Sequence, residues 1–235
     1  MNRPAATWFD DLPSGRCLAE FSMWSADLCD LARELDRIGP HADMLHIDVA
    51  DGVFAPAFLF FPDLVSAIRA RSRVPIHVHL MVDGPILLPQ VEQFAEAGAD
   101  LISIHAECAN AGEAVRLITS RGLLAGAVLR VESPLGTVAP LLDDLSMVTL
   151  LGTAIGVKGQ GLSDTAPGRI AAMRRMVTSA APTRRRIVAA DGGIRENTVP
   201  TLVASGAQTV VLGSLAFAAP DLKQRIRWLH ALPGA

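Results

Sequence analysis

The chain has 235 residues, of which 50% are hydrophobic and 19% are charged, and its formal net charge is −3. This apolar fraction excludes an intrinsically disordered chain, and the lack of a basic excess argues against a general nucleic-acid-binding protein. The three cysteines, Cys17, Cys29 and Cys108, contain no CxxC pair and are too few for a disulfide framework, which indicates a reducing compartment.

Short apolar segments alternate with longer amphipathic segments along the chain. Residues 1–17 are expected to form an N-terminal arm, either ordered through Trp8 and Phe9 or partly disordered, before a catalytic domain over 18–235. Strands are predicted, in chain order, at 20–24, 44–49, 76–80, 101–105, 125–129, 147–151, 187–191 and 209–213. Helices are predicted between and after them at 28–38, 63–70, 88–97, 111–121, 134–142, 165–179, 198–205 and 222–232.

The strand segments are short, apolar and often β-branched, which is typical of strands buried on both faces of a parallel sheet. Eight strand–helix units predict the α/β class and favour a single closed (β/α)8 TIM barrel, with an open eight-stranded sheet as the alternative. No segment reaches the ~20 apolar residues of a membrane span, and the N-terminus lacks the apolar core of a signal peptide. We therefore expect a cytoplasmic protein with neither a membrane nor a nucleic acid as partner.

Ionisable residues interrupt several of the predicted strands near their C-terminal ends. His46 and Asp48 are two positions apart in LHIDVADG, so both side chains should point into the barrel, where barrel enzymes keep their chemistry. His79 lies near the end of IHVHLM, and Asp191 ends the seventh strand. Two imidazoles and two carboxylates together suit one divalent ion, Zn²⁺, Fe²⁺, Mn²⁺ or Co²⁺. The alternative is that each histidine is an ordinary core residue and each aspartate caps a helix.

Glycines follow three neighbouring predicted strands, the sixth, seventh and eighth. Barrel enzymes commonly bind phosphate with backbone N–H groups of the last two of these loops. The three loops together predict an anion cradle, whereas a single loop would be read as an ordinary turn. The candidate substrate-binding residues in these loops are Gly156, Lys158, Gly159, Gly192, Gly193, Gly213 and Ser214.

Seven segments, in this order, resemble the ribulose-phosphate 3-epimerase family over about residues 20–220: SMWSADL, HIDVADGVFAP, HVHLMV, SIHAE, GVKGQ, ADGGI and LGSLAF. The resemblance implies a (β/α)8 barrel that uses a bound divalent metal to epimerise a ketose phosphate next to its carbonyl group. It implies metal ligands at His46, Asp48, His79 and Asp191. It also implies that Asp48 and Asp191 are the acid/base pair, and that Ser22, His79 and Met81 contact the substrate.

The implied chemistry agrees with these residue types. Epimerisation removes a proton on one face of a carbon and returns one on the other face, which two opposed carboxylates can do. The enediolate formed in between needs a Lewis acid, which the metal supplies. We therefore expect an isomerase. We also expect it to be a homo-oligomer. The alternatives are a metal-dependent lyase or aldolase on the same phosphate-binding barrel, and a non-catalytic phosphosugar-binding barrel.

Several positions depart from the pattern of the resembled family. Ala50 and Leu151 stand where it has two pocket methionines, Ala57 replaces an asparagine, and Lys158 replaces a glycine. These departures leave open whether the preferred substrate is D-ribulose 5-phosphate, its epimer D-xylulose 5-phosphate, or a tetrulose or hexulose phosphate. Lys158 is either a solvated loop residue or a contact to an anionic group. Three further polar residues are interpreted as structural: His77, His105 and Glu107.

Overall fold

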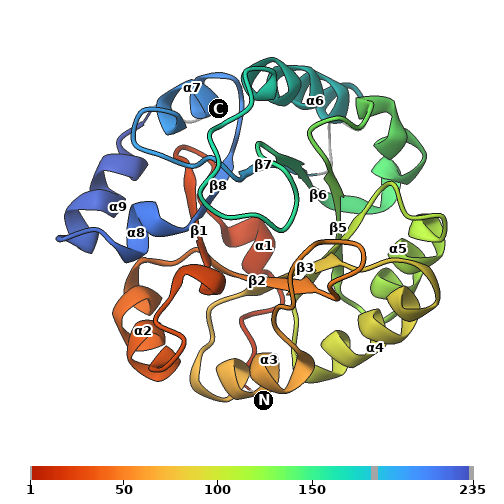
Figure 1. Ribbon diagram of the computed structural model, residues 1–235, viewed down its shortest axis with the longest axis horizontal. Helices are drawn as coiled ribbons and strands as arrows, with labels where there is room; N and C mark the ends of the chain where they lie inside the picture. Colours follow the sequence, from red (N-terminus) through yellow and green to blue (C-terminus); the bar gives the residue numbers. More distant parts are fainter. Residues whose placement is uncertain (1, 181–184, 233–235) are drawn as a thin grey trace.

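The computed structural model describes residues 2–180 and 185–232. In it, strands β1 to β8 close into a barrel in chain order, and each strand is parallel to both neighbours. The strands are β1 (Leu18–Ser22), β2 (Met44–Ala50), β3 (Ile76–Met81), β4 (Leu101–His105), β5 (Leu124–Leu129), β6 (Leu145–Leu151), β7 (Ile187–Asp191) and β8 (Thr209–Leu212). Figure 1 shows them in the middle of the molecule with helices around them. The predicted closed TIM barrel is confirmed, and the open sheet is excluded.

The helices other than the first pack their apolar sides on the outside of the barrel. They are α1 (Trp8–Asp11), α2 (Leu31–Ile38), α3 (Pro62–Arg71), α4 (Leu87–Ala97), α5 (Ala111–Ser120), α6 (Ala166–Ala180), α7 (Val199–Ala204), α8 (Ser214–Phe217) and α9 (Leu222–His230). In α4, Leu87, Val91 and Phe94 recur at helical spacing and are fully buried in the main core. Within the described residues, no helix combines the length and the apolar character needed to cross a membrane.

Several predicted elements differ from those in the structure. For example, α2 begins at Leu31 instead of residue 28, and β6 begins at Leu145 instead of residue 147. The first strand begins and ends two residues earlier than expected, and it ends at Ser22 because Met23–Ser25 already form a 3-10 turn at the barrel mouth. The helix predicted at 134–142 is a 3-10 segment over Leu135–Asp144 instead of an α-helix. Pro140 lies inside this segment, and its missing N–H group and its ring disfavour a continuous α-helix there.

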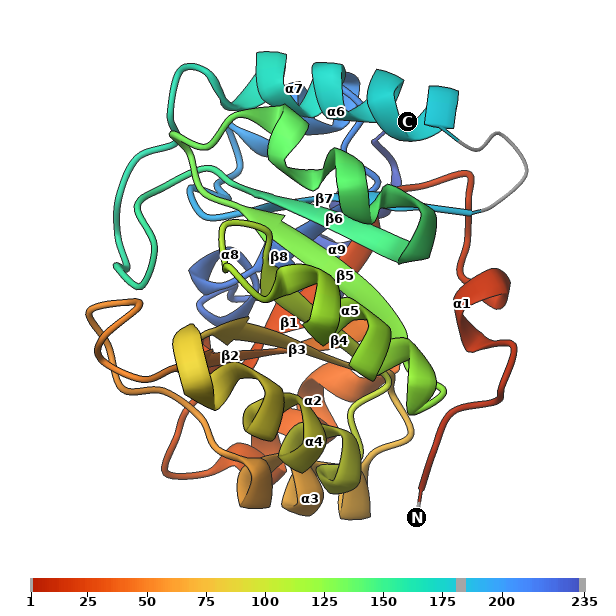
Figure 2. The same cartoon turned by 90° about the vertical axis from the view of Figure 1, so that its right-hand side faces the viewer.

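The N-terminal arm lies against the N-terminal end of the barrel. In Figure 2, α1 is on the side opposite to the long β2–α3 and β6–α6 loops. Phe9 and Leu12 are buried there, and they belong to one apolar cluster with six barrel residues: Leu18, Met44, Leu101, Met147, Ile187 and Ala189. The described part of the arm is therefore ordered, and it closes the end of the barrel that faces away from the predicted site.

The positions that point into the barrel change character toward the C-terminal ends of the strands. Above the apolar cluster is a set of buried polar side chains, which we call the polar layer: Glu20, His46, His77, Ser103, Thr149 and Thr209. Barrel interiors are more often filled by bulky branched residues. The next inward positions along the strands, two residues further on, include Ser22, Asp48, His79 and Asp191. The fold therefore places the polar layer directly beneath three of the predicted metal ligands, Asp48, His79 and Asp191, while the fourth, His46, belongs to the layer itself.

Candidate active site

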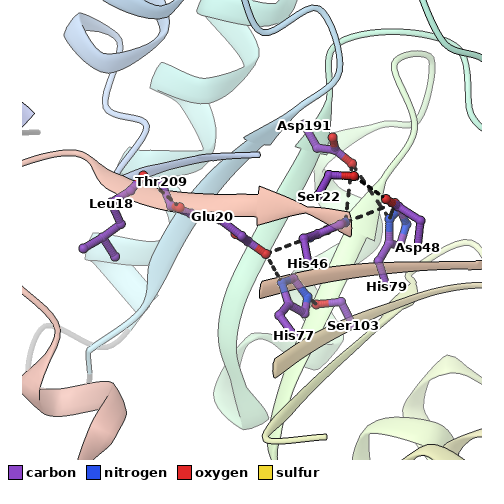
Figure 3. A network of polar contacts seen from close by, with 10 residues as sticks. All are labelled: Leu18, Glu20, Ser22, His46, Asp48, His77, His79, Ser103, Asp191 and Thr209. Atoms are coloured by element: carbon purple, nitrogen blue, oxygen red, sulfur yellow. Dashed lines mark hydrogen bonds and ion pairs between the residues drawn. The ribbon is translucent and has the colours of Figure 1, made fainter. Parts of the chain in front are cut away.

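The four residues predicted as metal ligands meet at the C-terminal end of the barrel. Their ligand atoms all lie within 4.8 Å of one another. The Oδ1 atom of Asp48 is 3.1 Å from His46 Nε2 and 3.5 Å from His79 Nδ1. The Oδ2 atom of Asp191 is 3.8 Å from His79 Nδ1 and 3.9 Å from His46 Nε2. Figure 3 shows the four side chains, from strands β2, β3 and β7, converging on one point.

This cluster fits a divalent cation. The Nδ1 atom of His79 is buried and has no hydrogen-bond partner, although it faces two carboxylates. Two carboxylates held this close together repel each other unless a proton or a cation lies between them. Two imidazole nitrogens and two carboxylate oxygens are ligands that zinc, iron(II), manganese and cobalt accept. The predicted residues therefore have the donor set and the spacing that the predicted ion requires.

The surroundings of the two carboxyl groups push their pKa values in opposite directions. Burial alone would raise both values. At Asp48 the imidazoles of His46 and His79 outweigh burial and hold the pKa of the carboxyl below its ordinary range. At Asp191 burial, reinforced by the charge of Asp48, raises the pKa. The same pair of positions therefore holds one carboxyl group that ionises readily and one that resists ionisation while no cation lies between them.

Ser22, at the end of β1, contacts this pair directly. Its hydroxyl donates a hydrogen bond of 2.8 Å to Asp48 Oδ2, and its side chain is buried. In this structure Ser22 therefore orients Asp48. A contact between Ser22 and substrate stays a prediction.

A cavity of about 330 Å³ opens above the cluster. Every residue predicted to bind substrate lines it: Ser22, His79, Met81, Gly156, Lys158, Gly159, Gly192, Gly193, Gly213 and Ser214. Leu151 also lines the cavity, whereas Ala50 is buried in a small cluster with Ala55 and Met81. Ala50 does not line the cavity itself, but its cluster includes two residues that do, Met81 and Ile155.

Sequence reasoning missed several residues of this cavity, among them Trp24, Ser25, Gln160 and Arg195. Trp24 and Ser25 lie two and three residues after Ser22 within the same motif, Gln160 follows Gly159, and Arg195 lies two residues after Gly193. Proximity to these predicted residues was the available signal. All four lie outside the α-helices and strands, where no periodic pattern shows which way a side chain points.

The two glycines after β7 are required by the backbone conformation and the close packing at their positions, whether or not a ligand binds there. Gly192 and Gly193 have φ values of 85° and 69°, which other residues rarely adopt. A Cβ atom on Gly193 would lie 2.7 Å from Leu162 Cα, and one on Gly192 would lie 2.3 Å from Thr153 Oγ1. Close packing against the β6–α6 loop therefore accounts for both glycines, and the anion cradle stays a prediction.

Lys158 connects the β6–α6 loop to the segment that follows β1. Its ammonium group donates a hydrogen bond of 2.5 Å to the carbonyl oxygen of Trp24 and lies 4.4 Å from the centroid of the Trp24 ring. Partial burial lowers the pKa of Lys158. Among the described residues, no carboxylate lies within ion-pair distance of it. The side chain thus places an unneutralised positive charge at the cavity.

The chain is similar to known proteins over most of its length. A family model described as the ribulose-phosphate 3 epimerase family matches residues 18–217. Ribulose-phosphate 3-epimerase of Bacillus subtilis is 33% identical over 207 residues, which cover 87% of this chain and 94% of that protein. Ribulose-phosphate 3-epimerase 2 of Cupriavidus necator is 35% identical over 206 residues, covering 85% and 84%.

A solved structure of 3-hexulose-6-phosphate synthase superposes with a TM-score of 0.66 at 14% identity, covering 92% of this chain and 100% of that one. At that identity it shows a shared barrel fold alone.

Proposed function

Since the chain belongs to the ribulose-phosphate 3-epimerase family, we propose that it is a metal-dependent 3-epimerase of a phosphorylated ketose. The predicted enzyme class, an isomerase, is confirmed by the same family. One observation supports the finer proposal above all others: two histidines and two aspartates converge on one point, and three of them, Asp48, His79 and Asp191, line a cavity of about 330 Å³. The lyase and the non-catalytic barrel are not favoured, because the curated relatives reported above are named as epimerases.

The two carboxylates perform the proton transfers in this proposal. Asp48 comes from β2 and Asp191 from β7, so they approach the reacting carbon from different sides of the barrel. One removes the proton next to the carbonyl group, and the other returns a proton to the opposite face. Ser22, whose hydroxyl donates a hydrogen bond to Asp48, holds its carboxylate in a fixed orientation.

His46, Asp48, His79 and Asp191 would hold the metal. When bound, a divalent ion supplies the positive charge that stabilises an enediolate. Zn²⁺, Fe²⁺, Mn²⁺ and Co²⁺ remain the proposed candidates, because mixed imidazole and carboxylate ligands suit all four.

The loops after β6, β7 and β8 would hold the phosphate group. Gly192, Gly193 and Ser214 offer backbone N–H groups at the cavity wall. Arg195 adds a positive charge beside them, and its guanidinium donates a hydrogen bond of 3.4 Å to Ser214 Oγ. Lys158 provides a second positive charge at the same cavity. This arrangement favours a substrate with a dianionic end group.

An NMR experiment in D₂O tests the proposal. Tetrulose, pentulose and hexulose phosphates would each be incubated with the metal-loaded protein. We expect deuterium at the carbon beside the carbonyl group, together with formation of the epimer, for at least one of them. Carbon–carbon cleavage products would support the lyase instead, and no exchange with any of these substrates would refute an epimerase. Sedimentation of the same preparation tests the predicted homo-oligomer.

A further inference from the structure

A buried carboxylate in the polar layer backs one of the proposed metal ligands. Glu20, on β1, is completely buried. Its Oε1 atom is 2.7 Å from His46 Nδ1, and it is also hydrogen-bonded to His77 Nδ1. His77 Nε2 in turn lies 2.7 Å from the hydroxyl of Ser103. Figure 3 shows this chain of contacts running from β1 through β2 and β3 to β4, directly below the side chains of Asp48 and Asp191.

The chemistry of these groups fixes where the protons are. An ionised carboxylate can only accept hydrogen bonds, so both Nδ1 atoms must donate to Glu20. A neutral His46 then has its lone pair on Nε2, the atom that faces Asp48 at 3.1 Å. Two acceptors at that distance repel each other unless a proton or a cation lies between them. Glu20 therefore selects the tautomer of His46 in which Nε2 is available to a metal.

We propose that Glu20 is a positioning residue that fixes His46 as an Nε2 ligand and raises its affinity for the cation through its buried negative charge. The proposal rests on the metal site of the proposed function. His77 and Ser103 hold Glu20 in place in their turn. Carboxylates behind ligating histidines typically contribute a factor of about 10–100 in metal affinity.

The other histidine ligand has a comparable support. His79 Nε2 lies 3.0 Å from His105 Nε2, and His105 Nδ1 lies 3.3 Å from Glu107 Oε2. Donation from His105 Nδ1 to Glu107 leaves His105 Nε2 as an acceptor, so His79 donates from Nε2 and keeps its lone pair on Nδ1. Both histidines thus present a lone pair to the same point. This agreement between two independent contact chains supports an orienting role for Glu20.

A second cation site at Glu20, His46 and His77 is the competing interpretation, because their ligand atoms also lie within 4.8 Å of one another. The geometry does not favour it. The 2.7 Å contact between His46 Nδ1 and Glu20 Oε1 is a hydrogen-bond distance, which leaves room for a proton and not for an ion.

Metal affinity in purified variants tests the proposal independently of turnover. Glu20→Gln keeps the shape of the side chain and an acceptor oxygen while it removes the charge. Glu34→Gln is the matched control, since Glu34 is also buried but lies on α2 and pairs with Arg37. Co²⁺ dissociation constants would be measured by competition with a chelator. The visible absorption of bound Co²⁺ reports its ligand geometry, and circular dichroism reports folding.

We expect Glu20→Gln to weaken Co²⁺ binding by about 10–100-fold and to change the Co²⁺ spectrum, with an effect of less than about 2-fold for Glu34→Gln. Wild-type affinity and spectrum in a folded Glu20→Gln protein would overturn the proposal. If Glu20→Gln does not fold, Ser103→Ala decides the question. This change removes the hydrogen bond between His77 and Ser103 and leaves the Glu20 side chain intact. Unchanged Co²⁺ binding in the Ser103→Ala protein counts against the proposal. Absence of Co²⁺ binding by the wild type would refute the metal site itself, which is a separate result.

Discussion

The contact between Lys158 and Trp24 should affect substrate binding more than turnover. Lys158→Met removes the ammonium group but keeps most of the apolar stem, so it deletes the hydrogen bond to the Trp24 carbonyl and the contact with the Trp24 ring. The change also removes a positive charge from the cavity wall. Gly156, in the same loop, lies close to Ala55 and Pro56 and is unaffected by the change.

The expected magnitude follows from the two contacts. Because Lys158 is exposed, the hydrogen bond contributes about 1 kcal/mol and the cation–π contact about 0.5–1 kcal/mol. Their sum of about 1.5–2 kcal/mol corresponds to a factor of about 10–30 in binding. The phosphate is remote from the reacting carbon and is bound equally in the ground and transition states. We therefore expect KM to rise about 10-fold and kcat to change by less than about 2-fold.

Steady-state kinetics with the best ketose phosphate would check this expectation. Lys223→Met, on α9, is the matched control, because it removes a lysine charge outside the cavity. Trp24→Phe should raise KM by a smaller factor, since it keeps the carbonyl and a weaker aromatic face. An unchanged KM in Lys158→Met would refute the reasoning. A fall in kcat at constant KM would instead place Lys158 among the groups that act only in the transition state.

Three further predictions concern the cluster and the layer beneath it. Asp48→Asn and Asp191→Asn should each lower kcat by about 10²–10⁴-fold, with metal content measured beside the rate because both residues are proposed ligands. Dialysis against a chelator should abolish activity and a divalent ion should restore it; activity that survives with less than about one-tenth equivalent of metal would exclude the site. Gly126→Ala should lower the free energy of unfolding by about 1–3 kcal/mol, because its Cβ would lie 2.0 Å from Ser103 Oγ. Urea unfolding would measure this loss, with partial recovery in the double variant Gly126→Ala, Ser103→Ala and little change in Gly136→Ala, where a Cβ meets nothing within 4 Å.

The positions of the four proposed ligands could be predicted from sequence because they follow a local rule. His46 and Asp48 are two residues apart on a buried strand, so they must share a face, and that face must be the interior of a closed barrel. The same rule places His79, near the end of β3, and Asp191, at the end of β7, on the inner face of the barrel. The strand order, once closed, then brings residues that are far apart in sequence to one point.

Contacts between irregular segments do not follow such a rule. Lys158 and Trp24 are 134 residues apart, and both lie in loop or 3-10 segments whose course depends on tertiary packing. The role of Glu20 could not be predicted from the sequence for a different reason. It lies in a regular strand, but its partners His46 and His77 are on two other strands, and which side chains meet across a barrel depends on the stagger between strands.

The polar layer lowers the stability of the fold. Its role in orienting the site explains why polar residues are present in it. Glu20 Oε2 and Thr149 Oγ1 are buried without a hydrogen-bond partner, and a buried carboxylate is stabilised only by what surrounds it. Apolar side chains of similar volume, such as those that fill the layer below, would avoid that penalty. They would also leave His46 without an acceptor for its Nδ1 proton. The outer faces of the strands and the apolar cluster under the arm therefore supply the stability of the barrel, while its central polar layer serves the orientation of the site above it.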